Sequence, residues 1–363
     1  MIKPLYIAAL HRPFNQQLKT SKWVCVFIAS SKKSYTASQL LPEFYYQMIF
    51  ILYREYQKEI PTSFNGLPSD TAVNTIYDYI KKSSKKKFLE ELPGIIRSRT
   101  TSIEKQIYST YKAASYYVNL AKDKFDLIDG KNILTHKGQE LTNIRSGFFA
   151  ISKKEAVFYF ERLLETDFHL FITRCLFIRL EKKYNLKSSL DEQGEFIVEY
   201  LRIRHFKFTS ASLSNYNVVR NWWVESLKIL DINGNIRKSF FEIIKNNAHF
   251  LSLYEDLNGL FKKFEAENFK AKTTYLRRKD QFLNLYRYML KKNKSDQDFV
   301  NLHDIKNEMR VSLENFQKLL SEFYEKEKGI RNIFFSNTVN SIDTRERFLV
   351  RNRPVIKIKI KEK

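Results

Sequence analysis

Asp126, Asp129 and Lys131 are the residues of this chain whose types and spacing could do chemistry. Metal-dependent nucleases combine acidic metal ligands with a lysine on a hairpin, and these three side chains surround a predicted turn. The two aspartates are close together in the sequence, whereas such ligands usually stand on separate strands. Asp129 followed by Gly130 is also a common turn dipeptide. The sequence therefore favours a turn at this position and not a catalytic site.

No other stretch has the spacing of a catalytic or cofactor motif. The sequence contains no glycine-rich phosphate loop, no paired-histidine metal motif and no nucleophile elbow. The six histidines are scattered, and His169 stands alone in an apolar segment, where a packed core residue is expected more than a zinc ligand. We expect a protein that is not an enzyme and that uses neither a cofactor nor a metal.

The strongest global feature is positive charge. The 363 residues include 63 Lys or Arg and 40 Asp or Glu, a net charge of +23. Six basic and no acidic residues occur in 1–42, and ten basic against three acidic residues occur in 328–363. A surface this basic repels itself unless a polyanion or an acidic partner offsets it. Because no basic amphipathic helix has a clean apolar face, nucleic acid is favoured over a membrane surface.

Composition also limits the fold class and the compartment. Cys25 and Cys175 lie far apart in apolar surroundings, which favours buried thiols in a reducing compartment over a disulfide framework. No apolar run is long enough to cross a bilayer, and Lys3 and Pro4 interrupt the first residues, so no signal peptide is expected. Only 9 Gly and 7 Pro occur in the chain, which favours a mainly helical body. We expect a cytoplasmic, mainly α protein.

The stretch from Thr101 to Leu141 contains the clearest local signals. Thr101 and Glu104 have the spacing of a capping box, which begins a helix. Apolar residues then recur every three or four positions and predict one buried face: Ile103, Ile107, Tyr111, Ala114 and Val118. The opposite face is polar and consists of Ser102, Lys105, Gln106, Ser109 and Lys112. Two short strands, 124–128 and 131–135, are expected on either side of Asp129-Gly130.

The residues that follow this hairpin carry a family resemblance. Leu134-Thr135-His136-Lys137-Gly138 resembles the L-T-x-K-G sequence that follows the wing in many bacterial winged-helix domains, and the resemblance covers residues 101–141. It implies a DNA-reading helix followed by a wing. The alternative is any helix followed by any hairpin. The lysine run 81–87 precedes this module and is either a solvated helix end, favoured by the helix dipole, or a phosphate contact.

Two later stretches repeat parts of this pattern. Ser189 and Glu192 form another capping-box spacing, and a helix over 215–230 is followed by a turn at Asn233-Gly234. Its buried stripe is expected to leave Asn217, Arg220, Asn221 and Lys228 outside. Arg220 with Asn221 suits base edges, but the pair is also an ordinary polar helix surface, which is the favoured interpretation. Between modules, 152–185 predicts a long helical pair. The seam Phe250–Phe264 predicts a helix that packs inside the protein, with a dimer contact as the alternative.

The C-terminal stretch predicts a third module. A short helix over 302–310 is followed by a helix that Ser312 caps, with Gln317, Lys318 and Ser321 facing outward. Strands are expected at 330–336, 347–351 and 355–361, with a turn at Asn352-Arg353. The last strand alternates isoleucine with Lys357, Lys359 and Lys361. It is either a sheet edge that lysines protect from aggregation or, beside several arginines, a basic wing against DNA.

Together these patterns predict a mainly α protein with small β-hairpin wings, in which tandem winged-helix-like modules are joined by helical connectors. The expected segments are a basic N-terminal β segment (1–36) with strands at Leu5–Leu10 and Trp23–Ala29, module 1 (37–150), a helical connector (151–188), module 2 (189–240), a second connector (241–294) and module 3 (295–363).

The expected function is non-catalytic binding of double-stranded DNA. Chains of this kind look like replication initiators, regulators and DNA-engaging subunits of bacterial restriction or antiviral defence systems. The alternative is a structural adaptor that docks protein partners in a larger complex. The predicted nucleic-acid-binding residues are Lys85, Lys86, Lys87, Ser102, Lys105, Gln106, Ser109, Lys112, Lys131 and Lys137 in module 1, Asn217, Arg220, Asn221, Arg237 and Lys238 in module 2, and Gln317, Lys318, Arg345, Arg347, Arg351, Arg353, Lys357, Lys359 and Lys361 in module 3.

Overall fold

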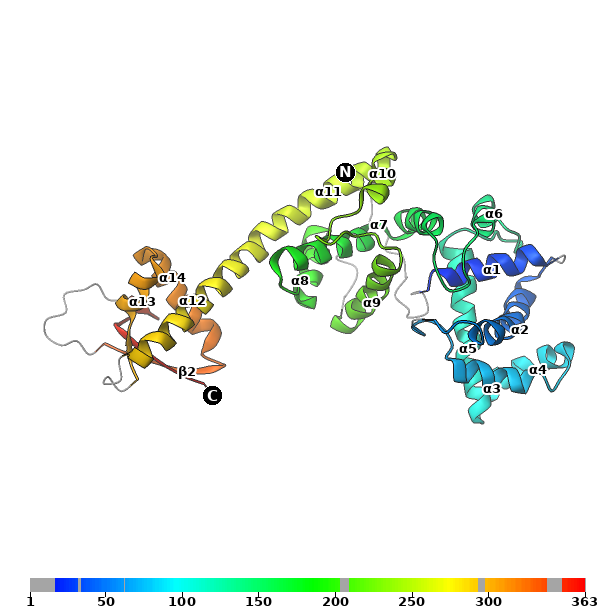
Figure 1. Cartoon of the computed structure of the whole chain (residues 1–363), viewed down its shortest axis with the longest axis horizontal. Helices are drawn as coiled ribbons and strands as arrows, with labels where there is room; N and C mark the ends of the chain where they lie inside the picture. Colours follow the sequence, from blue (N-terminus) through cyan, green and yellow to red (C-terminus); the bar gives the residue numbers. More distant parts are fainter. Residues whose placement is uncertain are drawn as a thin grey trace. The chain divides into compact units, whose positions relative to one another are not determined.

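The structure is a computed structural model that describes residues 17–31, 34–61, 63–202, 209–292, 298–337 and 348–362. The described chain is mainly helical with a few short antiparallel strands, as the composition predicted. Its contacts divide it into two compact units, Met1–Lys262 (unit 1) and Lys263–Lys363 (unit 2) (Figure 1). The strand expected at Leu5–Leu10 lies outside the described residues.

Unit 1 is built from helices whose starts are set by capping side chains. Thr36, Thr101, Ser152 and Ser189 each form a capping box, which satisfies backbone N–H groups that a first turn leaves free. The last three of these boxes were predicted from the sequence. The elements are α1 (Lys19–Ser30), α2 (Ala37–Tyr56), α3 (Asp70–Ile80), α4 (Lys85–Ser98), α5 (Ser102–Asn119), the π-helical turn η2 (Leu120–Lys124), α6 (His136–Asn143), α7 (Lys153–Tyr184), α8 (Leu190–Glu195), the π-helical turn η3 (Phe196–Tyr200), α9 (Ser210–Ser226), α10 (Lys238–Lys245) and α11 (Ala248–Phe264), which runs into unit 2.

Residues 23–29 belong to α1, so the strand expected there from branched and aromatic side chains is wrong. Trp23, Val24 and Cys25 are buried where α1 packs against α2, α5 and α6. Strand preference depends on the surface against which a segment packs, and here three helices provide that surface. Cys25 and Cys175 are buried and unpaired, as expected, and burial raises the pKa of each thiol to about 12.

The sequence predicts a pair of helices over 152–185, and the structure has one long helix there, α7, with a kink in it. Asp167 departs from helical geometry (φ −141°, ψ 28°) and is fully buried. Its Oδ1 accepts a hydrogen bond from Arg220 Nη2 of α9 at 2.6 Å, and burial raises the pKa of the carboxyl group to about 6 despite this pairing. Further along the chain, α11 packs inside unit 1 through Phe261, whose ring contacts Phe177 and Phe196.

Two loops of unit 1 have the same structure, and their equivalent positions differ by 102 in residue number. In the first copy the Asp129 carboxylate accepts hydrogen bonds from the N–H groups of Lys131 and Ile133. In the second copy Asp231 does the same for Asn233 and Asn235. The left-handed residues (126 and 132; 228 and 234), the isolated bridges (128–134; 230–236) and the eight-residue helices that follow, α6 and α10, also correspond. The two strands predicted at 124–128 and 131–135 are therefore reduced to a single bridge, and the second copy also has a single bridge.

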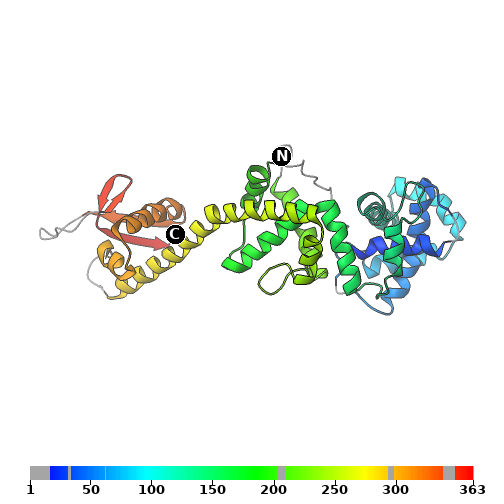
Figure 2. The same ribbon diagram turned by 90° about the horizontal axis from the view of Figure 1, so that it is seen from above.

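Unit 2 places three helices against one face of a small sheet (Figure 2). Its buried core includes Phe282, Phe316, Phe323 and Ile358. The three-stranded sheet has the order β1-β5-β2, and a separate hairpin pairs β3 with β4. The elements are the π-helical turn η4 (Glu265–Phe269), α12 (Lys270–Lys292), β1 (Val300–Asn301), α13 (Leu302–Met309), α14 (Leu313–Glu327), β2 (Arg331–Ser336), β3 (Phe348–Val350), β4 (Arg353–Val355) and β5 (Lys357–Glu362).

The C-terminal strand is not the sheet edge that one of its two predictions described. β5 pairs with β1 on one side and β2 on the other, so it is the central strand of the sheet. The predicted alternation is correct, because Ile358 is buried in the core while Lys361 is exposed. The β3–β4 turn is formed by Arg351 and Asn352 (φ 50° and 60°), one residue earlier than expected, and two left-handed residues match a type I′ turn.

Candidate nucleic-acid interface

A rigid three-residue turn joins α4 to α5. Arg99 ends α4 in the left-handed conformation, and Thr101 caps α5. Glu104 Oε2 accepts a hydrogen bond from the Ser98 hydroxyl at 2.7 Å. It also accepts hydrogen bonds from the N–H groups of Thr100 (2.7 Å) and Thr101 (3.1 Å). Ser98 first, and then the two threonines, lower the pKa of Glu104 to about 2, so this carboxylate fixes the turn between α4 and α5.

The polar face predicted for α5 is largely exposed. Ser102, Lys105, Ser109 and Lys112 are exposed, whereas Gln106 is half-buried. The buried face is rotated slightly from the predicted one and consists of Ile107, Thr110, Ala113, Ala114 and Tyr117. Thr110 replaces an apolar residue in this stripe because its hydroxyl lies 2.9 Å from the hydroxyl of Tyr45 on α2, within hydrogen-bonding distance.

A tyrosine lies between two cations beside the start of α5. The guanidinium of Arg99 is 4.4 Å from the centre of the Tyr108 ring, and Lys112 Nζ is 5.9 Å from it. Such contacts attract the charged ends of long basic side chains to the face of the ring. The sequence did not predict three residues of this surface, namely Arg97, Arg99 and Tyr108. The alternation of basic residues after Pro93 could have indicated the two arginines.

The lysine run is divided between two helices. Lys81 and Lys82 follow α3, whereas Lys85, Lys86 and Lys87 form the first turn of α4, which Ser84 caps. The prediction of a helix end favoured by the dipole is therefore wrong for the last three lysines. All five are exposed. Lys81 pairs with Asp78, Lys85 with Glu43 and, at 3.9 Å, Lys87 with Glu91.

Beyond α5, the loop residues are fixed by local contacts. Lys131 is exposed at the tip of the first loop copy. Lys137 lies 3.7 Å from a carboxylate oxygen of Asp126 and 3.1 Å from one of Glu165, so its charge is partly compensated. Gly138 is required, because a Cβ there would lie 2.2 Å from the Leu127 carbonyl oxygen. Asp129, considered above as a metal ligand, accepts hydrogen bonds from its own loop.

In the second module the expectation that α9 presents Arg220 outward is wrong. Arg220 is 1% exposed and paired with Asp167. Asn217 donates a hydrogen bond to Gln193, and Asn221 accepts one from Arg174. At the second loop copy, Arg237 donates to the Leu230 carbonyl, while Lys238 is exposed in the first turn of α10. The residues proposed for base contacts on α9 therefore hold the protein together.

In unit 2 several predicted residues also have internal partners. Gln317 exchanges two hydrogen bonds with the backbone of Leu349, which fixes the β3–β4 hairpin against α14. Arg351 pairs with Glu325 at 2.8 Å, and this pairing raises the pKa of its guanidinium. Lys318 and Arg353 are exposed. Lys359 pairs with Asp298 at 3.0 Å, Lys357 is half-buried, and Arg345 and Arg347 lie outside the described residues.

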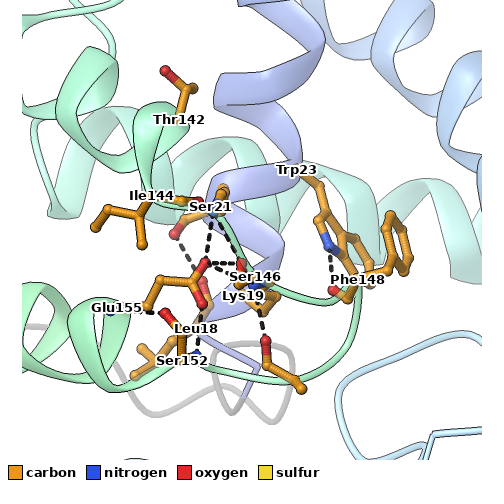
Figure 3. Close-up of polar contacts among 12 residues, drawn as sticks. Leu18, Lys19, Ser21, Trp23, Thr142, Ile144, Ser146, Phe148, Ser152 and Glu155 are labelled. Carbon is orange, nitrogen blue, oxygen red and sulfur yellow. Dashed lines mark hydrogen bonds and ion pairs between the residues drawn. The ribbon is translucent and has the colours of Figure 1, made fainter.

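The sequence did not reveal a buried cluster in which Lys19 and Lys22 of α1 share the carboxylate of Glu155, and Figure 3 shows Lys19 and Glu155 in it. Glu155 Oε1 lies 2.6 Å from Lys19 Nζ and 2.7 Å from Lys22 Nζ, and none of the three side chains is more than 8% exposed. Burial alone would raise the pKa of Glu155, but the hydrogen bonds from Lys19, Lys22 and Ser146 outweigh it and hold the pKa at about 2. Glu155, the counter-ion of both lysines, lies more than 130 residues away from each of them in the sequence.

The lysines of this cluster also line a cavity of about 530 Å³ between α1 and α2, whose walls include Trp23, Phe44 and Phe148. Its size is typical of small-molecule pockets. Lys19 donates to Ser146, to the Ala150 carbonyl and to Glu155, and Lys22 to the Ile144 carbonyl, Ser146 and Glu155. An ammonium group has three hydrogens, so both groups are saturated by protein acceptors. The cluster therefore clamps α1 to residues 144–155 and has no donor left for a ligand.

Two kinds of site are not found in the part of the chain that the structure describes. No helix there is long and apolar enough to span a membrane, and no three His, Cys, Asp or Glu side chains gather where they could hold a metal ion. The exposed basic surface of α4 and α5, with the turn after α3, is the strongest candidate site in unit 1. In comparisons with known proteins, no family model matches the chain, and neither a curated protein nor a solved structure matches it.

Proposed function

We propose that the chain binds duplex DNA through the helix–turn–helix of α4 and α5, with the N-terminal half of α5 in or near the major groove. Residues 81–112 contain nine Lys or Arg and three Glu, a local net charge of +6. All nine basic residues are exposed. Neutralising phosphates releases the counterions condensed on DNA, so clustered cations of this kind favour binding.

The observation that carries the proposal is the position of Lys85, Lys86 and Lys87 in the first turn of α4. A helix N-terminus has a partial positive charge, so cations there are disfavoured by about 0.3–1 kcal/mol each. The same place is favourable for binding an anion, because free N–H groups and the dipole add to the lysine charges. Three lysines at an unfavourable place for folding are therefore explained by phosphate binding.

The other two predicted reading helices support this choice by contrast. On α9, the candidates for base contacts have internal partners, and Arg220 is buried. In unit 2, the order helix, strand, two helices and four strands, with β5 between β1 and β2, supports a winged-helix assignment. The second of the two helices α13 and α14 nevertheless has four Glu against two Lys, so α14 has a net charge of −2. We propose that α14 does not enter the major groove.

The test is a substitution that should change stability and DNA affinity in opposite directions. Replacing Lys86 and Lys87 with Glu puts negative charge at the N-terminus of α4, which should raise the melting temperature slightly. The same change should weaken duplex binding and flatten the salt dependence by about two units of slope, since each phosphate contact contributes about 0.9. Fluorescence anisotropy with duplex DNA over a salt series measures the affinity.

The matched control replaces Lys262 and Lys263 of α11 with Glu. Both lysines are exposed, and the substitution changes the net charge by the same amount. Equal losses of affinity in the two variants would mean that only total charge matters and would contradict the proposed interface. A duplex affinity of the wild type that does not depend on salt would favour the alternative function, an adaptor that docks an acidic protein partner.

A further inference from the structure

The outer face of the sheet in unit 2 combines aromatic and basic side chains, of which Phe334 and Lys361 are exposed while Phe299, Lys357 and Lys359 are half-buried. The inner face packs on the helices through Val300, Ile358 and their neighbours. On the outer face, the register of β2 with β5 places Phe334 opposite Lys359, and Phe334 is 49% exposed. Alternation along each strand sends these two side chains away from the core.

A second ring lies on the other side of the same lysine. Phe299 precedes β1 by one residue, and the pairing of Val300 with Ile358 places it beside Lys359. Lys359 Nζ lies 5.8 Å from the centre of the Phe299 ring. Phe299, Lys359 and Phe334 therefore form one row across the three strands. Lys357 and Lys361 lie two residues along β5 on either side, at about 7 Å from Lys359 by the rise of a strand.

We propose that this outer sheet face binds single-stranded nucleic acid, with a base stacked on Phe334 and phosphates held by Lys357, Lys359 and Lys361. A large ring at the solvent face of a sheet gains little from folding, but it offers a flat apolar surface to a base. Duplex DNA keeps its bases stacked inside, so only an unpaired strand can use such a surface. This inference does not depend on duplex binding by α4 and α5.

Among the described residues, Asp298 is an acidic side chain that pairs with a lysine of the proposed surface, and it gives the proposal a distinctive test. Asp298 Oδ2 lies 3.0 Å from Lys359 Nζ, and the Asp298 side chain is 66% exposed. A phosphate would compete with this carboxylate for the lysine. Asp298 has a left-handed backbone (φ 66°), which asparagine also tolerates, so Asp298→Asn removes the competitor without strain. The variant should bind a single strand more tightly, by up to about fivefold, since an ion pair whose carboxylate is largely exposed is a weak competitor.

The experiment measures anisotropy of labelled oligothymidylate and oligouridylate of about ten nucleotides, a length within the usual site sizes, with the intact chain. Phe334→Ala should weaken both by about tenfold, because stacking does not use the 2′-hydroxyl, whereas Phe334→Trp should retain binding. Lys357, Lys359 and Lys361 replaced together by Gln should reduce the salt slope by about two units, since each contact with a single strand contributes about 0.7. Duplex affinity should not change in Phe334→Ala, which separates this surface from α4 and α5.

Ultraviolet crosslinking of oligothymidylate followed by peptide mapping provides a second measurement. Crosslinks in β2 or β5 are expected. Crosslinks confined to α4 and α5, or unchanged oligonucleotide affinity in Phe334→Ala and Asp298→Asn, would overturn the proposal. In the latter case an acidic protein partner would be the occupant that the charge of this face fits.

Discussion

Changing Glu155 to Gln should destabilise unit 1 far more than changing Lys19 to Met, although both changes remove one charge from the same buried cluster. Two ammonium groups and one carboxylate leave an excess of one positive charge, and none of the three side chains is more than 8% exposed. Glu155→Gln raises that excess to two. Lys19→Met removes it and leaves a neutral pair of Lys22 and Glu155.

The magnitudes follow from the contacts. Removing the shared carboxylate leaves two buried ammonium groups without a counter-ion, which costs about 3–5 kcal/mol. Glutamine can still serve in the Ser152 capping box, so the change isolates the charge. Lys19→Met leaves the Ala150 carbonyl and Ser146 with fewer donors, a cost of about 1–2 kcal/mol that water at the exposed Ala150 reduces.

Urea unfolding followed by circular dichroism measures both free energies of unfolding. We expect a melting temperature about 10 °C lower for Glu155→Gln. If Lys19→Met destabilised the protein as much as Glu155→Gln, the excess positive charge would not be what the carboxylate offsets, and the reasoning would be refuted.

Three further predictions concern unit 1. Ile107→Asp should lower the free energy of unfolding by more than about 4 kcal/mol, because Ile107 is fully buried. Lys105→Glu with Lys112→Glu should instead weaken DNA binding at a nearly constant melting temperature. Calorimetry and anisotropy on both variants separate the two faces of α5, and similar melting temperatures would show that the assigned faces are wrong. Gly138→Ala should cost about 3 kcal/mol or more, since its Cβ would meet the Leu127 carbonyl, while Gly130→Ala, which meets nothing within 4 Å, is the control in chemical denaturation. Glu155 has a folded pKa of about 2 against an ordinary value of 4.5, so its stabilisation is present above pH 4.5 and is lost as the pH falls towards 2; melting temperatures of wild type and Glu155→Gln should converge over that range, and a constant difference would contradict the assignment.

Features that depend on a few neighbouring residues could be predicted from the sequence. The capping boxes at Thr101, Ser152 and Ser189 each need only a hydroxyl and a carboxylate three positions apart, and all three are present. The exposed lysines of α5 follow from helical periodicity, which fixes the two faces of a helix to within about one residue. Thr110 shows the limit, because its place in the buried stripe depends on Tyr45 of another helix.

Features that depend on distant partners could not be predicted. Arg220 has the spacing of a surface residue, and only the kink at Asp167 of α7 provides the partner that allows it to be buried. The isoleucine–lysine alternation of β5 indicates one buried face but carries no information on how many strands lie beside it. The row formed by Phe299, Lys359 and Phe334 likewise arises from strand register, which joins residues up to 60 positions apart.

The loop that occurs twice in unit 1 has a consequence for protein engineering. Its shape depends on an aspartate that binds two N–H groups and on two left-handed residues, and the flanking helices supply neither. The same joint therefore connects an exposed basic helix, α5, to α6 and a helix with a buried arginine, α9, to α10. A joint that is independent of the surfaces it connects should be transferable, so that a helix of chosen surface could be grafted before either copy while the second helix keeps its start.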